Sequence, residues 1–172
     1  VDRELGDLSV DQVLINNEEG GYQSGKHLVN LGHRRIGVIC GPRALRLTVE
    51  RLTGFRRALE EVGLTLNDDV IVEGNFQYQS GMESMRILLE RGAGLSAIFA
   101  ANDQMAIGAI SYLQQHQLRV PEDMSIMGYD DILEGTIFYP NLTTISQPTS
   151  EIGQLSVKLL LERIKQVDIA PR

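Results

Sequence analysis

The sequence predicts an α/β fold in which a doubly wound parallel sheet lies between two layers of helices, a three-layer α/β/α arrangement. Two observations predict it. Short apolar runs rich in branched residues alternate with longer segments of helical periodicity along the chain, a pattern typical of successive strand–helix–strand units. The 172 residues, 42% of them hydrophobic, also suffice for one well-buried domain.

The first predicted unit is a helix followed by a buried strand. The helix follows residues 12–15, where Asn16 can cap it with Glu19 at the third helical position, and Gly32 ends it. Residues 36–40 then form an apolar run of strand length, which predicts a core strand. The apolar contacts of the helix come from Tyr22, Leu28, Val29 and Leu31.

Two further units follow the break at Gly41–Pro42. A helix that ends near Gly63 carries an apolar residue at every third or fourth position, and a short strand at residues 70–72 comes after it. The apolar face of this helix consists of Leu52, Phe55, Leu59 and Val62. Ser80 and Glu83 match a capping box for the next helix. The apolar residues of that helix are Met85, Leu88 and Leu89.

The C-terminal half repeats the pattern. Residues 97–101 predict a strand of small residues, and Asp103 can cap the helix after it. That helix carries Met105, Ile107 and Leu113. The remaining elements are predicted to be a turn at Pro121, a strand at 125–128, an irregular segment through Pro140, an extended stretch at 142–146, and a helix from Pro148 to about Gln166.

Polar residues in the loops that follow strands are the candidate ligand-binding residues, because a doubly wound sheet binds ligands outside the carboxyl ends of its strands. Those loops hold Arg51, Phe76, Asn102, Asp103 and Asp130. A guanidinium, an amide and carboxylates make directional hydrogen bonds to hydroxyls, and an aromatic ring packs against a C–H face. The set predicts a site for a neutral polyol such as a sugar.

Each member of this set has a structural alternative. Asp103 precedes a helix and can simply cap it, Phe76 can pack in the core, and Arg51 can lie on a helix surface. Asp130 and Asp131 can form a turn. The prediction therefore depends on the convergence of the loops and not on any single residue.

Catalytic and metal sites are not indicated. His27, His33 and His116 lie far apart, without partners at metal-ligand spacing. The sequence has no phosphate-binding loop and no nucleophile elbow, and the glycines at 92–94 follow a helix, which is the wrong context for a dinucleotide. Asp130–Asp131 in a strand-like stretch would point to opposite sides. We expect no catalysis, no metal and no cofactor.

The net charge of −7 argues against direct DNA binding by this chain, because phosphate neutralisation needs a positive field. Cys40 is the single cysteine and lies in an apolar run, which indicates a buried residue in a reducing compartment, the cytoplasm. No apolar run approaches the roughly 20 residues of a membrane helix. The start at Val1, without a methionine, predicts a fragment of a longer protein.

Five strings of the sequence resemble regulators of the LacI/GalR family, in the same order and at the expected intervals. The match covers nearly the whole chain, and it is specific because five separate strings agree. The strings are LGHRRIGVICGP (31–42), RLTGFRRALEEVGL (51–64), ANDQMAIGA (101–109), LRVPEDMSIMGYDD (118–131) and LTTISQP (142–148).

The resemblance implies one lobe of a sensor that is similar to periplasmic sugar-binding proteins. Members of this family have a helix-turn-helix headpiece that binds operator DNA and a two-lobed sensor that grips an effector, and they act as homodimers. By this resemblance, residues 1–15 are the end of the first lobe and the crossover strand, and residues 16–146 are the second, effector-binding lobe. Residues 147–172 return to the first lobe as a segment and a helix. The headpiece and most of the first lobe are then absent from this chain.

The resemblance also implies roles for individual residues. Arg51 matches the arginine that forks onto effector oxygens, and Phe76 matches an aromatic residue that stacks on the ligand. Asn102 and Asp103 match a polar pair that contacts sugar hydroxyls, and Asp130 in GYDD matches the acceptor that fixes the ligand. Weaker transfers are Asp2 and Gln147.

Departures from the family pattern narrow the effector class. Ile15 stands where many relatives have an aspartate, so the contact of that aspartate is not expected here. Leu45 and Leu47 replace polar residues of purine-responsive relatives, which argues against a purine. The strings GNFQYQSG and ANDQMA are most similar to ribose-responsive members, so we expect ribose or a similar pentose as the effector of a repressor of a sugar-utilisation operon. Two alternatives remain, a sugar-binding protein of a transport system and a small α/β enzyme such as a sugar isomerase.

Overall fold

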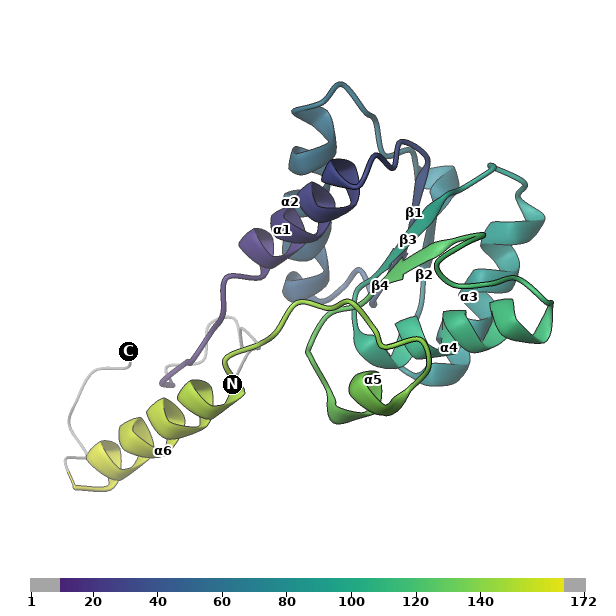
Figure 1. Cartoon of the computed structure of the whole chain (residues 1–172). Helices are drawn as coiled ribbons and strands as arrows, with labels where there is room; N and C mark the ends of the chain where they lie inside the picture. The colour runs from purple at the N-terminus through teal and green to yellow at the C-terminus, as the bar shows by residue number, and fades with distance from the viewer. Residues whose placement is uncertain (1–9, 166–172) are drawn as a thin grey trace. The chain divides into compact units, whose positions relative to one another are not determined.

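The computed structural model describes residues 10–165 (Figure 1), which belong to two compact units. The larger unit comprises residues 17–146, and the smaller one combines residues 10–16 with residues 147–165. Each unit has its own packing. Asp2, one of the predicted site residues, lies outside the described residues.

The larger unit is built on a four-stranded parallel sheet with the spatial order β2-β1-β3-β4. Its strands are β1 (Ile36–Cys40), β2 (Ile71–Glu73), β3 (Ala97–Ala100) and β4 (Ser125–Met127). Val38 of β1 is in register with Ile71 on one side and with Phe99 on the other. The chain leaves β1 in one direction to form β2, and β3 and β4 then add on the opposite side of β1. The boundary between β1 and β3 is therefore the topological switch point of the sheet.

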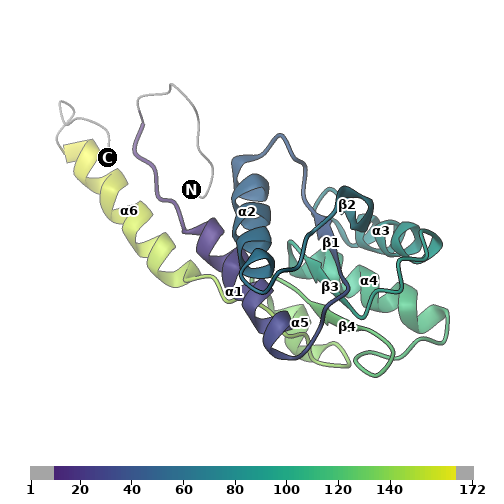
Figure 2. The same cartoon turned by 90° about the horizontal axis from the view of Figure 1, so that it is seen from above.

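Helices cover both faces of this sheet. Helices α1 and α2 lie together on one face, and α3 and α4 lie together on the other (Figure 1, Figure 2). Their bounds are Asn17–Asn30 for α1, Arg46–Glu60 for α2, Tyr78–Glu90 for α3 and Asp103–Gln115 for α4. Shorter turns of helix are η1 (Asp68–Val70) and α5 (Leu133–Ile137). The predicted parallel sheet and the three-layer α/β/α arrangement are confirmed.

The core of the larger unit fills the space on both sides of the two central strands, in which every residue is buried. On the α2 side, Phe55 stacks on Phe99 of β3 with ring centroids 4.8 Å apart. On the other side, α3 and α4 contribute Met85, Leu88, Met105, Ile110 and Leu113. Removing these apolar side chains from water is the main force that holds the helices to the sheet.

Glycines allow α1 and α2 to approach each other closely. A Cβ atom added to Gly21 of α1 would collide with the backbone of Arg51, and one added to Gly54 of α2 would collide with the carbonyl oxygen of Glu18. No other residue type fits at these two positions without moving a helix. The two glycines thus determine where Arg51 lies relative to α1.

The predicted capping box at Ser80 and Glu83 is not formed. Helix α3 begins two residues earlier, at Tyr78. Ser80 lies inside the first turn, where its Oγ donates to the carbonyl oxygen of Gln77 and accepts from the backbone N–H of Asn75. The serine therefore closes the turn that precedes the helix, a role that Ser side chains often take near helix starts.

Two further details between β3 and residue 146 differ from prediction. Asn102 and not Asp103 is the N-cap of α4, since its Oδ1 accepts from the backbone N–H of Met105. Asp130 and Asp131 are not strand-like, because their φ angles are 119° and 62°. The prediction that they lie in a strand, with side chains on opposite sides, is therefore wrong.

The smaller unit comprises residues 10–16 and helix α6 (Thr149–Lys165), which begins directly after Pro148 as expected. The guanidinium of Arg163 donates to both carboxylate oxygens of Asp11, from Nε at 2.7 Å and from Nη2 at 2.9 Å. None of the residues of α6 is buried. Its exposed large apolar side chains are Leu155, Val157, Leu160, Leu161 and Ile164.

Candidate functional site

The structure brings four of the predicted site residues together at the carboxyl edge of the sheet. Phe76 follows β2, Asn102 follows β3 and Asp130 follows β4. Arg51 reaches the same edge from α2, where it donates to the carbonyl oxygen of Ala101, the residue after β3. This contact places the guanidinium at the switch point between β1 and β3, where ligands bind in sheets of this type.

The guanidinium of Arg51 is held from three sides. Its Nε donates to Oδ1 of Asn17 at 2.8 Å, and its Nη1 donates to the carbonyl oxygen of Ala101 at 2.5 Å. Its central carbon lies 3.7 Å from the ring centroid of Tyr129, which is a cation–π contact. Because Arg51 is only 3% exposed, the alternative of a surface arginine is wrong. The charge is oriented before any ligand arrives.

Asp130 supplies a negative charge beside this positive one. Its Oδ1 lies 3.7 Å from Nη1 of Arg51, and its side chain is 27% exposed. The backbone N–H of Asp130 donates to the carbonyl oxygen of Ile145 at 2.8 Å, although the φ angle of 119° is unfavourable for a side-chain-bearing residue. Strain of this kind persists where the surrounding contacts enforce it, often in ligand-binding loops. The edge therefore presents a fixed donor and a partly exposed acceptor side by side.

Asn102 and Phe76 form the β2 side of the site. Besides capping α4, Asn102 donates from Nδ2 to the carbonyl oxygen of Phe76 at 3.0 Å. This bond ties the loop after β2 to the loop after β3 and holds Phe76 at a φ angle of 66°. The half-buried ring of Phe76 covers Gly41, where a Cβ atom would collide with it. Phe76 thus packs against the end of β1 and keeps part of its ring accessible.

Asp103 is completely buried and serves the loop on the other side of α4. Its Oδ1 accepts from the hydroxyl of Thr144 at 2.6 Å, and its Oδ2 accepts from the backbone N–H of Ile132 at 2.9 Å. Burial raises the pKa of this carboxyl above its ordinary value, while the hydrogen bond from Thr144 acts in the opposite direction. The carboxylate anchors the segment that carries α5, next to the site.

The two weaker candidates belong to other parts of the chain. Asp2 lies outside the described residues. Gln147 belongs to the smaller unit, where its carbonyl oxygen accepts from the backbone N–H of Thr149 at 2.8 Å. The assembled set is therefore Arg51, Phe76, Asn102 and Asp130, with Asp103 behind it.

Sequence reasoning missed two residues that position Arg51. Asn17 is buried in the first turn of α1 and accepts the Nε hydrogen bond, and Tyr129 places its ring against the guanidinium. Asn17 follows the predicted cap residue Asn16, and Tyr129 lies inside the string GYDD. Their side chains gain importance only when α1, α2 and the end of β4 come together, so local patterns carried no signal for them.

Metal sites and membrane-spanning helices are absent from residues 10–165. This part of the chain contains no group of three or more His, Cys, Asp or Glu side chains arranged to hold a metal ion. None of its helices combines the length and the apolar character that a bilayer crossing requires.

Comparison with known families matches this geometry. Residues 26–172 fit the model of the periplasmic binding protein-like domain. The chain belongs to that family. Its relatives are transcriptional repressors and its structural neighbours include LacI-family regulators, so the resemblance seen in the five strings is confirmed.

Two curated relatives illustrate the similarity. The chain is 47% identical over 155 residues to the HTH-type transcriptional repressor PurR of Aliivibrio salmonicida. This alignment covers 90% of the chain and 46% of the relative. The chain is 42% identical over 159 residues to the ribose operon repressor of Haemophilus influenzae, covering 92% of the chain and 48% of the relative. The chain spans about half the length of the curated relatives it matches.

Solved structures of transcriptional regulators share the fold. The transcriptional regulator CelR in complex with cellobiose superposes with a TM-score of 0.91 at 38% identity, over 98% of this chain and 52% of that one. A LacI family regulator from Enterococcus faecium with bound ribose superposes with a TM-score of 0.86 at 34% identity, over 94% of this chain and 60% of that one. Both names are those of transcriptional regulators, which supports the regulator over the transport protein.

Proposed function

We propose that this chain binds the effector of a transcriptional repressor that controls a sugar-utilisation operon, with ribose or a similar pentose as the effector. The observation that carries the proposal is the fixed guanidinium of Arg51 beside the carboxylate of Asp130 at the switch point of the sheet. A sugar hydroxyl both donates and accepts, so neighbouring hydroxyls can bond to a cation and an anion at once. Phe76 offers a ring to the C–H face of the same sugar.

The names of relatives support two effector classes. The ribose operon repressor and the ribose-bound regulator support a pentose, and the repressor PurR, at 47% identity, supports a purine as the second candidate. Leu45 and Leu47, both half-buried at the start of α2, argue against a purine, because they stand where purine-responsive relatives have polar residues. Ribose is therefore the first choice, and a purine base is the comparison ligand.

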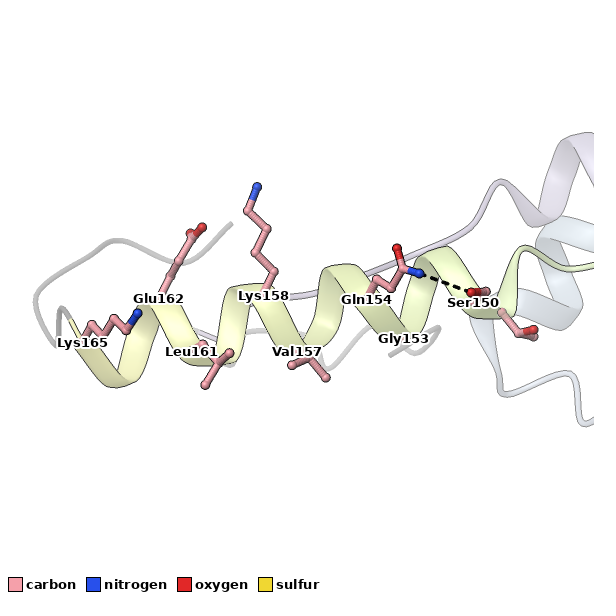
Figure 3. A pocket seen from close by; sticks show the side chains of 9 residues that line it. Ser150, Gly153, Gln154, Val157, Lys158, Leu161, Glu162 and Lys165 are labelled. Carbon is pink, nitrogen blue, oxygen red and sulfur yellow. Dashed lines mark hydrogen bonds between the residues drawn. The ribbon is translucent and has the colours of Figure 1, made fainter.

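The two units support the proposed division of the chain into parts of two lobes. Residues 17–146 form a complete α/β unit, whereas α6 of the smaller unit buries no residue. Gly153, Val157 and Leu161 are spaced four apart along one side of α6, and Lys158 and Glu162 extend from another side (Figure 3). An apolar helix face of this kind is stable when it packs against further structure. In our proposal that structure is the rest of a first lobe.

The proposed mechanism is a population shift in the whole protein. Effector binding between two lobes favours one lobe arrangement, and a homodimer transmits that arrangement to two headpieces on operator DNA in the cytoplasm. The effector switches the protein only by the difference in its affinity for the two arrangements. No covalent bond changes, so we expect no turnover of the sugar.

The test is isothermal titration calorimetry of the full-length gene product with ribose, other pentoses, hexoses and a purine base. Arg51→Ala should weaken binding of the preferred ligand by about 1.5–3 kcal/mol, the range for hydrogen bonds to a charged group. Arg57→Ala is the matched control, because it removes one positive charge from the same helix at an exposed position paired with Glu18. Equal affinities of the two variants, or the absence of binding to any sugar, would refute the proposal.

A further inference from the structure

Thr48 carries a buried hydroxyl that has no hydrogen-bond partner among residues 10–165. The residue is completely buried, and its Oγ1 is the one buried side-chain oxygen or nitrogen among residues 10–165 that has no hydrogen bond. Buried polar groups are nearly always paired, because water cannot compensate for the missing bond. An orphan hydroxyl of this kind raises the free energy of the state that contains it.

The position of Thr48 on α2 places this hydroxyl next to the candidate site. Thr48, Arg51 and Phe55 lie on one face of the helix, at intervals of three and four residues. Phe55 stacks on Phe99 within β3, and Arg51 bonds to Ala101 just after β3. Thr48 is one turn nearer to the helix N-terminus, so it lies past the strand ends, on the side where ligands bind.

The N-terminus of α2 strengthens this assignment. Cβ bonds of a helix tilt toward its N-terminus, so the buried Thr48 side chain leans toward the turn that enters the helix. No side chain caps α2 at Leu45, and no acidic residue lies in its first turn. The partial positive charge of this helix end is therefore available to an oxygen-bearing ligand.

We infer that Thr48 is a specificity-determining residue of the effector site, whose hydroxyl is unpaired in the free protein and bonds to a hydroxyl of the bound sugar. The inference rests on the proposed function. The hydroxyl is completely buried, so in this inference the bond forms as the turn at residues 42–47 shifts on binding. That turn is held to the helix start by the bond from the N–H of Leu45 to the carbonyl of Pro42, and it is exposed at Arg43 and Ala44.

In this inference, the Thr48 hydroxyl contributes to the free-energy difference between the free and the sugar-bound states. In the free state it lacks a partner, and in the bound state it gains one, so the sugar has higher affinity for the arrangement in which the turn has moved. A ligand without a hydroxyl at this position leaves the Thr48 hydroxyl unpaired, so its free-energy penalty remains. Thr48 thereby distinguishes a polyol from an effector that is apolar on the α2 side.

The experiment compares Thr48→Val, which is nearly isosteric, with Thr48→Ser, which keeps the hydroxyl, in the full-length gene product. Ribose affinity by calorimetry should fall about tenfold in Thr48→Val, the loss expected for one hydrogen bond, and should be largely retained in Thr48→Ser. The thermal midpoint of the ligand-free Thr48→Val protein should equal or exceed that of the wild type, because an unpaired buried hydroxyl is gone. Thr53→Val is the matched control, since Thr53 is exposed on the same helix and its hydroxyl already bonds to the carbonyl of Val49.

The outcomes separate the inference from the proposed function. Unchanged ribose affinity in Thr48→Val, while Arg51→Ala still loses affinity, overturns the role of Thr48 and leaves the proposed function intact. A lower thermal midpoint together with equal losses in Thr48→Val and Thr48→Ser shows a purely structural residue and also overturns it. If the wild-type protein binds no ribose, the proposed function fails and the inference fails with it.

Discussion

The Nε of Arg51 donates a 2.8 Å hydrogen bond to Oδ1 of Asn17, and both side chains are buried although 34 residues separate them in the chain. The acceptor comes from the first turn of α1 and the donor from the middle of α2. A buried arginine whose head group is bonded on one edge has little rotational freedom, so its remaining hydrogen-bonding capacity is directed toward the carboxyl edge of the sheet. In the proposed site, Asn17 therefore positions Arg51 for the ligand.

Replacing Asn17 with alanine should reduce ligand affinity without touching the ligand. Arg51 would lose one of its fixed partners and keep its buried charge, which costs about 1–3 kcal/mol, or roughly 5- to 150-fold in the dissociation constant. Calorimetry with the preferred sugar measures the loss. Asn17→Asp preserves an acceptor at the same position and should retain most of the affinity. An Asn17→Ala protein with wild-type affinity would show that Ala101 and Tyr129 suffice to orient Arg51.

The packing of α1 on α2 should be sensitive to single methyl groups. Gly54→Ala places a Cβ atom against the carbonyl oxygen of Glu18, so the helices must separate, at a cost of about 1–3 kcal/mol in the free energy of unfolding. Gly135→Ala is the matched control, because Gly135 is also helical but a Cβ atom there makes only ordinary contacts, the nearest at 3.5 Å to Leu142. That control should be neutral or stabilising by up to about 1 kcal/mol. Urea denaturation measures both, and equal behaviour of the two variants would contradict the close contact.

The sequence was sufficient for the fold and for the approximate place of the site. Alternating apolar runs and helical periods depend on neighbours in the chain, which is why the parallel sheet and its two helical layers could be predicted. The loops after the strands were then known, and Arg51, Phe76, Asn102 and Asp130 lie at one edge as expected. The connectivity rule for doubly wound sheets supplied this convergence.

The finer structure depended on contacts that local patterns do not encode. Asn102 and Asp103 are equally good caps by residue type, and the choice between them follows from Thr144 and Ile132, which occupy the carboxylate of Asp103 from a distant segment. The left-handed backbone at Asp130 likewise results from pairing with residues 145–146. Long-range pairing, and not local preference, decided each of these details.

Cys40 should be unreactive toward thiol reagents in the native protein. It is completely buried at the end of β1, and burial raises the pKa of its thiol, which lowers the fraction of the reactive thiolate. Modification by a chromogenic disulfide should therefore be slow in buffer and fast in denaturant, with a native rate that rises as urea promotes opening. Rapid stoichiometric modification of the native protein would show that the end of β1 opens more readily than its packing indicates.

The carboxyl of Asp103 should leave a defined signature in the pH dependence of stability. Burial raises its pKa in the folded protein above the ordinary value of 3.8, so the folded state binds a proton more tightly than the unfolded state does. Its contribution to stability is then fully present below pH 3.8 and is lost as pH rises through the folded pKa. Above that pH the contribution stays constant.

The comparison that isolates this effect is wild type against Asp103→Asn, measured by urea denaturation from pH 3 to pH 7. Asparagine cannot titrate, and every other group changes equally in the two proteins, so the difference in unfolding free energy reports Asp103 alone. The wild type should lose stability relative to the variant as pH rises from 3.8 through the raised pKa, and the difference should be flat above it. A wild type that instead gains relative stability over this range would mean that the hydrogen bonds from Thr144 and Ile132 outweigh burial and hold the pKa below 3.8.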